Sequence, residues 1–83
     1  MRYFFHVDDS HDLEGTELSS TAVAKCEAVK LAGRMLCDGA SEFWDSDGFM
    51  MIVTDDRGLL LFTLDFVGME APAIQAVPPP TFA

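Results

Sequence analysis

Hydrophobic residues gather in three stretches of the chain that are predicted to be β-strands. Residues 2–7, 49–54 and 59–66 are rich in aromatic and branched apolar side chains and contain no glycine or proline, which is typical of strands. The connection at residues 55–58, Asp-Asp-Arg-Gly, is short and ends in glycine. The last two strands are therefore predicted to form an antiparallel hairpin.

A helical pattern begins at Ser19 or Ser20 and continues to Asp38. Either serine suits the N-cap position, and Gly39 supplies a stop. Most charged side chains of this stretch fall within one arc of about 80° on the helical wheel. The other positions are mostly small or apolar, so this amphipathic helix can approach a sheet closely: Ala22, Cys26, Ala28, Val29, Ala32, Gly33, Met35, Leu36, Cys37.

The only two cysteines, Cys26 and Cys37, both fall within the predicted helix. At a rise of 1.5 Å per residue they stand roughly 16 Å apart, whereas a disulfide needs Cα atoms within about 7 Å. The helix therefore excludes an intramolecular disulfide. Both thiols are expected to be small buried core residues on the apolar side of the helix.

The order of elements predicts the fold class. Residues 14–18, in which Gly15 marks a turn or bulge, add a short strand to the three longer ones. Strands, one helix and a final hairpin indicate an α+β fold, with a three- to four-stranded antiparallel sheet and one amphipathic helix packed on one face. We expect one domain over residues 1–67 and an extended C-terminal tail over residues 68–83, which contains three consecutive prolines.

One helix covers only one face of a sheet, yet both faces of the last two strands are predicted to be apolar. In the last strand, even-numbered residues from Leu60 to Phe66 face one side, and Leu59 and Leu61 the other. A sheet open to water on one side should alternate more cleanly. The second face is therefore expected to be covered by the tail, a second copy or another protein. The predicted interaction face consists of Phe4, His6, Trp44, Met50, Ile52, Leu59 and Leu61.

Composition narrows the class of protein. The 83 residues are 49% hydrophobic and carry a net charge of −9, which fits one small folded domain and not a disordered acidic tail. Most of the acidic residues lie in residues 1–20 and 41–58, on either side of a predicted helix whose own acidic and basic charges nearly cancel. This acidity argues against binding to nucleic acid or to anionic membranes. No apolar run could cross a membrane or serve as a secretion signal, so we expect a cytoplasmic protein.

The densest set of potential ligands lies between His6 and Glu14. Imidazole and carboxylate groups can hold Zn²⁺, Mn²⁺ or Ni²⁺, and the weak metal candidates are His6, His11 and Asp12. Their spacing matches no known metal motif, so the favoured interpretation is a solvated acidic turn beside a strand histidine. Neither histidine lies near a cysteine in sequence, and no glycine-rich phosphate loop is present. We therefore predict no enzymatic activity and no cofactor.

Phe43 and Trp44 stand among acidic residues in a stretch, 41–48, that is predicted to be a linker. Tryptophan is common at interaction hot spots, so this pair could anchor a partner. The alternative is that both rings close one end of the small core.

Several motifs resemble a family of short bacterial proteins known as a domain of unknown function, common in alphaproteobacteria of the Rhizobium type. The resemblance covers residues 2–66 and is carried by the YFFHV opening at 3–7, the EGTEL segment at 14–18, the alanine-rich helix and the final hairpin. This family has no established activity, so the resemblance implies no catalytic residue. The 7–14 stretch is shorter than is usual for the family, and Met50 and Ile52 stand where polar residues are expected.

These observations predict a non-enzymatic protein-interaction module that acts as a homodimer. Its acidic surface suits a basic partner, such as a toxin or a nucleic-acid-binding protein. The alternative is a metal- or small-ligand-binding protein that uses the His6–Glu14 segment.

Overall fold

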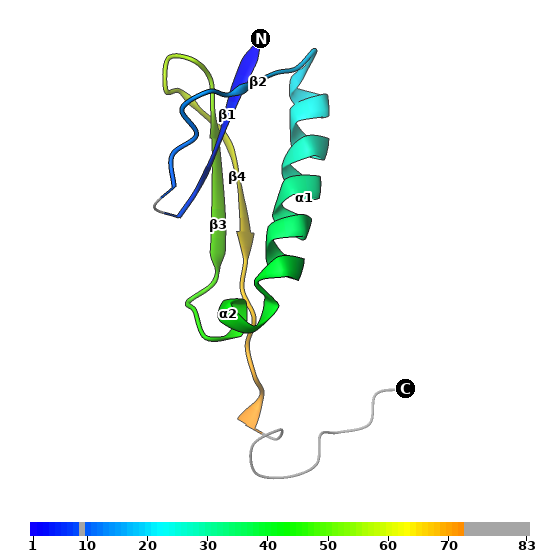
Figure 1. Ribbon diagram of the computed structural model, residues 1–83, viewed down its shortest axis with the longest axis vertical. Coiled ribbons are helices and arrows are strands. Elements are labelled where there is room, and N and C mark those ends of the chain that lie inside the picture. The colour runs from blue at the N-terminus through cyan, green and yellow to red at the C-terminus, as the bar shows by residue number, and fades with distance from the viewer. Residues whose placement is uncertain (9, 73–83) are drawn as a thin grey trace.

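A four-stranded antiparallel sheet with one long helix along one face forms the molecule (Figure 1). The computed structural model describes residues 1–8 and 10–72. Within them the sheet has the order β2-β1-β3-β4, and the α+β class predicted from the sequence is confirmed. The elements are β1 (Arg2–Val7), β2 (Thr16–Glu17), α1 (Thr21–Asp38), α2 (Ala40–Trp44), β3 (Phe49–Thr54) and β4 (Leu60–Phe66).

The register of the sheet fixes which side chains face α1. Phe5 pairs with Val53, and Val53 pairs with Phe62. Because side chains alternate along a strand, the odd-numbered residues of β1 and β3 share the helix side with Phe62, Leu64 and Phe66. The buried core consists of Tyr3, Val7, Met51 and Val53 of the sheet and Ala24, Ala28 and Ala32 of the helix.

Helix α1 starts as its sequence predicts. Ser20 is the N-cap, and its hydroxyl oxygen accepts a hydrogen bond from the Val23 N–H at 3.2 Å. The three buried alanines recur every four residues, so one side of α1 lies close against the sheet without large side chains between them. This close approach was predicted from the small residues of the helix.

The position of the cysteines corrects the sequence analysis. Cys26 and Cys37 lie on α1 as predicted, but both are exposed. The side of α1 away from the sheet also exposes Val29, at 55%, and Gly33. Small apolar residues therefore continue around the helix beyond the part that the sheet can cover, which is why the wheel could not identify the buried side.

The hairpin between β3 and β4 is held by Asp55, which is 8% exposed. Its Oδ1 accepts hydrogen bonds from the N–H groups of Arg57, at 2.8 Å, and Leu59, at 2.9 Å. Gly58 adopts a positive φ of 83°, as a glycine at the end of such a turn can. The predicted hairpin is confirmed.

The stretch that was predicted to be a linker contains the short helix α2. Phe43 is half-buried and Trp44 is 59% exposed, with their ring centroids 5.8 Å apart in an edge-to-face arrangement. A Cβ built on Gly68 would lie 2.7 Å from Trp44 Cζ3, so both rings sit against the backbone that follows β4. Of the predicted tail, residues 73–83 lie outside the described residues, including the three prolines.

Candidate functional site

The side of the sheet away from α1, which we call the outer face, carries most of the predicted interaction residues. Register places Phe4 and His6 of β1 beside Thr54 and Ile52 of β3 on this face. The loop after β1 partly covers the first two, whereas Met50 and Ile52 are 45% and 36% exposed. The structure therefore leaves an apolar patch open on β3.

On β4 the outer face differs from the prediction. A bulge between Val53 and Thr54 shifts the register, so that Leu60 pairs with Thr54 and Leu61 packs against the core. Leu60 thus takes the outer position that was predicted for Leu61, and it is 56% exposed. Below the bulge, Thr63 and Asp65 occupy the outer face, so this face is less apolar than predicted.

The predicted metal candidates are brought together, but as a hydrogen-bonded support for β1. The Asp12 N–H donates to His6 Nδ1 at 3.1 Å. Because Nδ1 accepts, the neutral ring carries its proton on Nε2, which lies 3.1 Å from Thr54 Oγ1 and donates to it. The His11 ring lies edge-on to His6 at 5.4 Å.

The Asp12 carboxylate caps the free side of β1. Its Oδ2 accepts from the Phe5 N–H at 3.1 Å, and its Oδ1 accepts from the N–H groups of Glu14 and Gly15. Burial by itself would raise the pKa of Asp12, but these backbone donors outweigh it and hold the pKa below its usual value. Asp12 is therefore a structural acceptor in its ionised form.

These contacts leave little capacity for a metal. Both ring nitrogens of His6 already have hydrogen-bond partners. Within residues 1–8 and 10–72, no group of three or more His, Cys, Asp or Glu side chains is arranged to hold a metal ion. His6 and Asp12 instead join the loop after β1 to the sheet through these hydrogen bonds.

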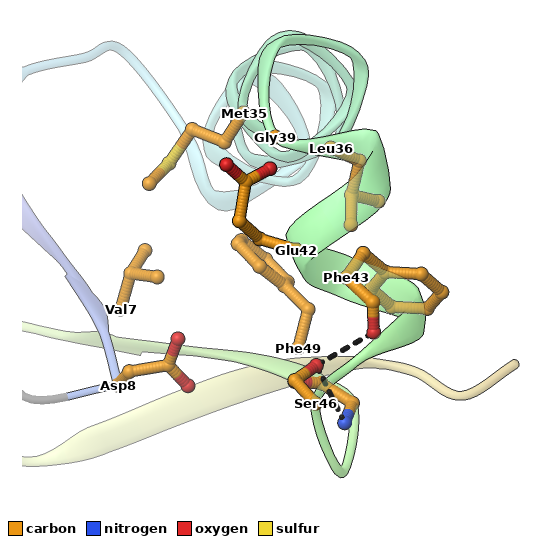
Figure 2. Close-up of a pocket in the computed structure, with 10 residues that line it drawn as sticks. Val7, Asp8, Met35, Leu36, Gly39, Glu42, Phe43, Ser46 and Phe49 are labelled. Atoms are coloured by element: carbon orange, nitrogen blue, oxygen red, sulfur yellow. Dashed lines mark hydrogen bonds between the residues drawn. The ribbon is translucent and has the colours of Figure 1, made fainter.

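A hollow of about 250 Å³ opens where α1 ends, between α2 and the ends of β1 and β3. We call it the acidic hollow. Figure 2 shows the carboxylates of Asp8 and Glu42 at its border. The rest of the lining is mostly apolar: Val7, Met35, Leu36, Phe43 and Phe49, with Gly39, Ser46 and Gly48. The sequence alone does not predict this site, because its residues come from β1, α1, α2 and β3 and the turns that follow or precede them.

A second hollow, of about 340 Å³, adjoins the first at Asp8, Gly48 and Phe49. Asp47 and Asp65 add two more carboxylates to its lining. No lysine or arginine lines either hollow, and no ion pair within the described part of the chain involves their acids. This end of the molecule therefore combines apolar side chains with carboxylates that no basic residue in the described part of the chain neutralises.

Backbone geometry holds Asp8 at the border of both hollows. Its φ is +48°, in the left-handed region that aspartate and asparagine tolerate better than most residues. The Asp8 N–H donates to the Met50 carbonyl at 3.4 Å. Asp8 is thus the residue at which β1 leaves the sheet, and this turn directs its carboxylate toward the end of the molecule.

Comparison with known proteins assigns a family but no chemistry. A family model described as "Domain of unknown function (DUF6894)" matches residues 2–68, from β1 to just beyond β4. The resemblance to a domain of unknown function is thereby confirmed, and the link to Rhizobium-type bacteria stays a prediction. No curated protein and no solved structure matches the chain. In the described part of the chain, no helix is long and apolar enough to cross a membrane.

Proposed function

The chain belongs to the DUF6894 family, whose description assigns no activity, and on the evidence of its surfaces we propose that it is a non-enzymatic module that binds other protein chains. The observation that carries this proposal is the end of the molecule with the two hollows. Their apolar lining and unneutralised carboxylates suit a side chain with an apolar stem and a cationic head. Lysine and arginine of a basic partner protein have this character.

The charge of the whole chain supports the same partner. A net charge of −9 attracts a basic protein over a distance of about one Debye length and speeds its association. The acidic hollow, at about 250 Å³, lies below the 300–1,000 Å³ that is common for small-molecule sites, and the adjoining hollow, at about 340 Å³, lies at the lower end of that range. Side-chain recognition on a partner surface therefore fits it better than binding of a free ligand.

Homodimerisation completes the proposed function. Small single domains have limited cores, and a partner subunit is a common source of additional stability. Phe62, Leu64 and Phe66 of β4 are only half-buried in one copy, and a second copy can cover their remaining exposed surface. We further expect the protein in the cytoplasm, because the exposed thiols of α1 suit a reducing compartment.

A binding titration tests the recognition of basic chains. The probe is a peptide of alternating lysine and leucine, with a glutamate–leucine peptide as the control. The readout is the fluorescence of Trp44, whose ring contacts that of Phe43 in the lining of the acidic hollow. We expect binding of the lysine peptide only, and weaker binding at higher salt. Equal binding of both peptides, or of neither, would contradict the proposal.

A matched pair of double variants locates the site. Asp8→Asn with Glu42→Gln removes two charges from the acidic hollow, and asparagine tolerates the positive φ of position 8. Asp56→Asn with Glu14→Gln removes the same charge from residues outside both linings. The first variant is expected to weaken binding several-fold more than the second. An equal effect would show that net charge alone attracts the peptide.

A further inference from the structure

In the described residues, one edge of the sheet is covered by other backbone and side-chain groups and the other edge is not. Along the β1 edge, β2 pairs with Arg2 and Tyr3, the Asp12 carboxylate caps the Phe5 N–H, and Val7 exchanges backbone hydrogen bonds with Ser10. The opposite edge is β4, and no strand in the described residues pairs with its outer side. An uncovered edge of this kind accepts another strand.

Alternation along the strands identifies the backbone groups that this edge offers. The N–H groups of Phe5 and Val7 form hydrogen bonds on the side of β1 that is away from β3. The backbone groups of His6, which lies between them, therefore bond to β3. The direction of the backbone groups alternates in the same way along β3 and β4, so the N–H and C=O groups of Leu64 point toward β3. The N–H and C=O groups of Thr63 and Asp65, on either side of Leu64, therefore point away from β3, at the open edge of the sheet.

The sequence of β4 is symmetric about Leu64. The segment 62–66 reads Phe-Thr-Leu-Asp-Phe, so its apolar positions read the same in both directions. An antiparallel copy centred on Leu64 would place Phe62 opposite Phe66 and Leu64 opposite itself, on the helix side. On the outer face, each Thr63 hydroxyl would meet the partner's Asp65 carboxylate and donate to it.

We propose that two copies of the chain pair through β4, antiparallel about a two-fold axis at Leu64, into one continuous sheet. This inference rests on the proposed homodimer and names its interface. The outward backbone groups of Thr63 and Asp65 form the hydrogen-bonded pairs of the new ladder, and the Leu64 pair lies between them. Phe62, Leu64 and Phe66 are only half-buried in one copy, so the ladder covers apolar surface that α1 leaves open.

A second copy suits this edge better than an unrelated strand because every cross-strand pair is matched. No charge faces an apolar residue in this register, and no like charges face each other. An isologous contact of this kind also closes after two copies, since each β4 is used once. The bulge at Val53/Thr54 lies beyond the symmetric segment and leaves its register undisturbed.

Charge variants at position 63 test the register. In the full chain, Thr63→Lys places an ammonium group opposite the partner's Asp65, and Thr63→Glu places a second carboxylate there. Sedimentation velocity over a concentration series is expected to show a dimer dissociation constant lowered about threefold or more by lysine and raised by at least as much by glutamate. Ser19→Lys and Ser19→Glu make the same charge changes at an exposed site away from β4. The dimer dissociation constants of these two Ser19 variants are expected to differ less, and their difference measures the effect of net charge alone.

Thr63→Pro tests the backbone ladder. The Thr63 N–H points away from β3, so proline removes a donor that one copy does not use, and edge strands accept proline at such positions. We expect the circular dichroism of α1 to be retained and dimerisation to weaken by about tenfold or more. If this variant unfolds, the lysine and glutamate variants still decide.

The outcomes separate this interface from the proposed homodimer. A wild-type chain that stays monomeric at all concentrations overturns both. A dimer in which the position 63 variants behave like those of Ser19 keeps the homodimer and overturns pairing through β4. The same result follows if amide hydrogen exchange at Thr63 and Asp65 does not slow as the concentration rises. A dimer that proline disrupts, but that ignores the charge at position 63, overturns the register about Leu64.

Discussion

Removal of the Asp12 side chain is expected to loosen the edge of β1. The carboxylate accepts three backbone N–H groups, of which that of Phe5 belongs to a strand and lies in a part-buried site. An unpaired donor of that kind costs about 1–3 kcal/mol. The Gly15 donor is also part-buried and the Glu14 donor is exposed, and these two loop donors add about 1 kcal/mol together. Asp12→Ala should therefore lower the free energy of unfolding by about 2–4 kcal/mol, a large part of the stability of so small a domain.

The pH dependence of stability gives an independent measure of the same contacts. The pKa of Asp12 in the folded chain lies below its ordinary value of 3.8, because backbone donors favour the ionised form. Its contribution is therefore fully present above about pH 4 and is lost as the pH falls through the folded pKa. Asp12→Asn keeps one oxygen acceptor but cannot ionise, so its deficit relative to the wild type should shrink below pH 4.

Urea denaturation followed by the helical circular dichroism of α1 measures both effects. Glu14→Ala is the matched control, because it removes a neighbouring carboxylate that accepts no backbone hydrogen bond in the described structure. The reasoning is refuted if Asp12→Ala costs no more than Glu14→Ala at pH 7. It is equally refuted if the deficit of Asp12→Asn stays constant from pH 7 to pH 3.

Four further predictions follow from the turns and the helix. Asp55→Ala leaves two backbone N–H groups of the hairpin without their acceptor and should cost about 2 kcal/mol, whereas Asp56→Ala, at an exposed neighbour, should change the Tm little. Gly48→Ala should destabilise the fold by about 1–3 kcal/mol, because φ is +131° and a Cβ would lie 2.9 Å from a backbone oxygen. Gly33→Ala, in open space on α1, should stabilise the fold by about 1 kcal/mol. Thermal unfolding would detect a change in Tm of either sign. Both cysteines should react with a thiol reagent without denaturant, and protection of either would contradict their exposure.

The elements that were predicted correctly are those whose signal is local. The N-cap serine, the glycine after α1 and the Asp-Asp-Arg-Gly turn each act within a few residues, so sequence alone located the helix and the hairpin. The short helix α2 was missed because five residues make little more than one helical turn, which is too short to show a repeating pattern. Its Phe43 and Trp44 are held by contact with Gly68, which lies far along the chain.

The errors about side-chain environment have a different cause. Cys26 and Cys37 look like core residues on a helical wheel, but the sheet covers only the side of α1 that carries its buried alanines. Leu61 alternates correctly along its strand, yet one bulge transfers the outer position to Leu60. In both cases the deciding contact lies on another element, which a local pattern does not contain.

The site shows the same division. Sequence analysis identified the acidity and the outer-face residues Phe4, His6, Met50 and Ile52, because alternation along a strand is a local property. The acidic hollow needed the turn at Asp8 to come beside α2, and nothing in the sequence between them predicts that meeting.

The strand order also governs when the sheet can be completed as the chain is synthesised. The first strand, β1, pairs with β3 through partners such as Phe4 and Thr54, which stand 50 residues apart in the sequence. The aromatic N-terminal strand therefore leaves the ribosome long before its main partner exists, whereas α1 and the β3–β4 hairpin form from neighbouring residues. Pairing of such distant segments is slow, so docking of β1 is expected to be the late step, and exposed Phe4 and Phe5 make the incomplete chain the form most prone to aggregate.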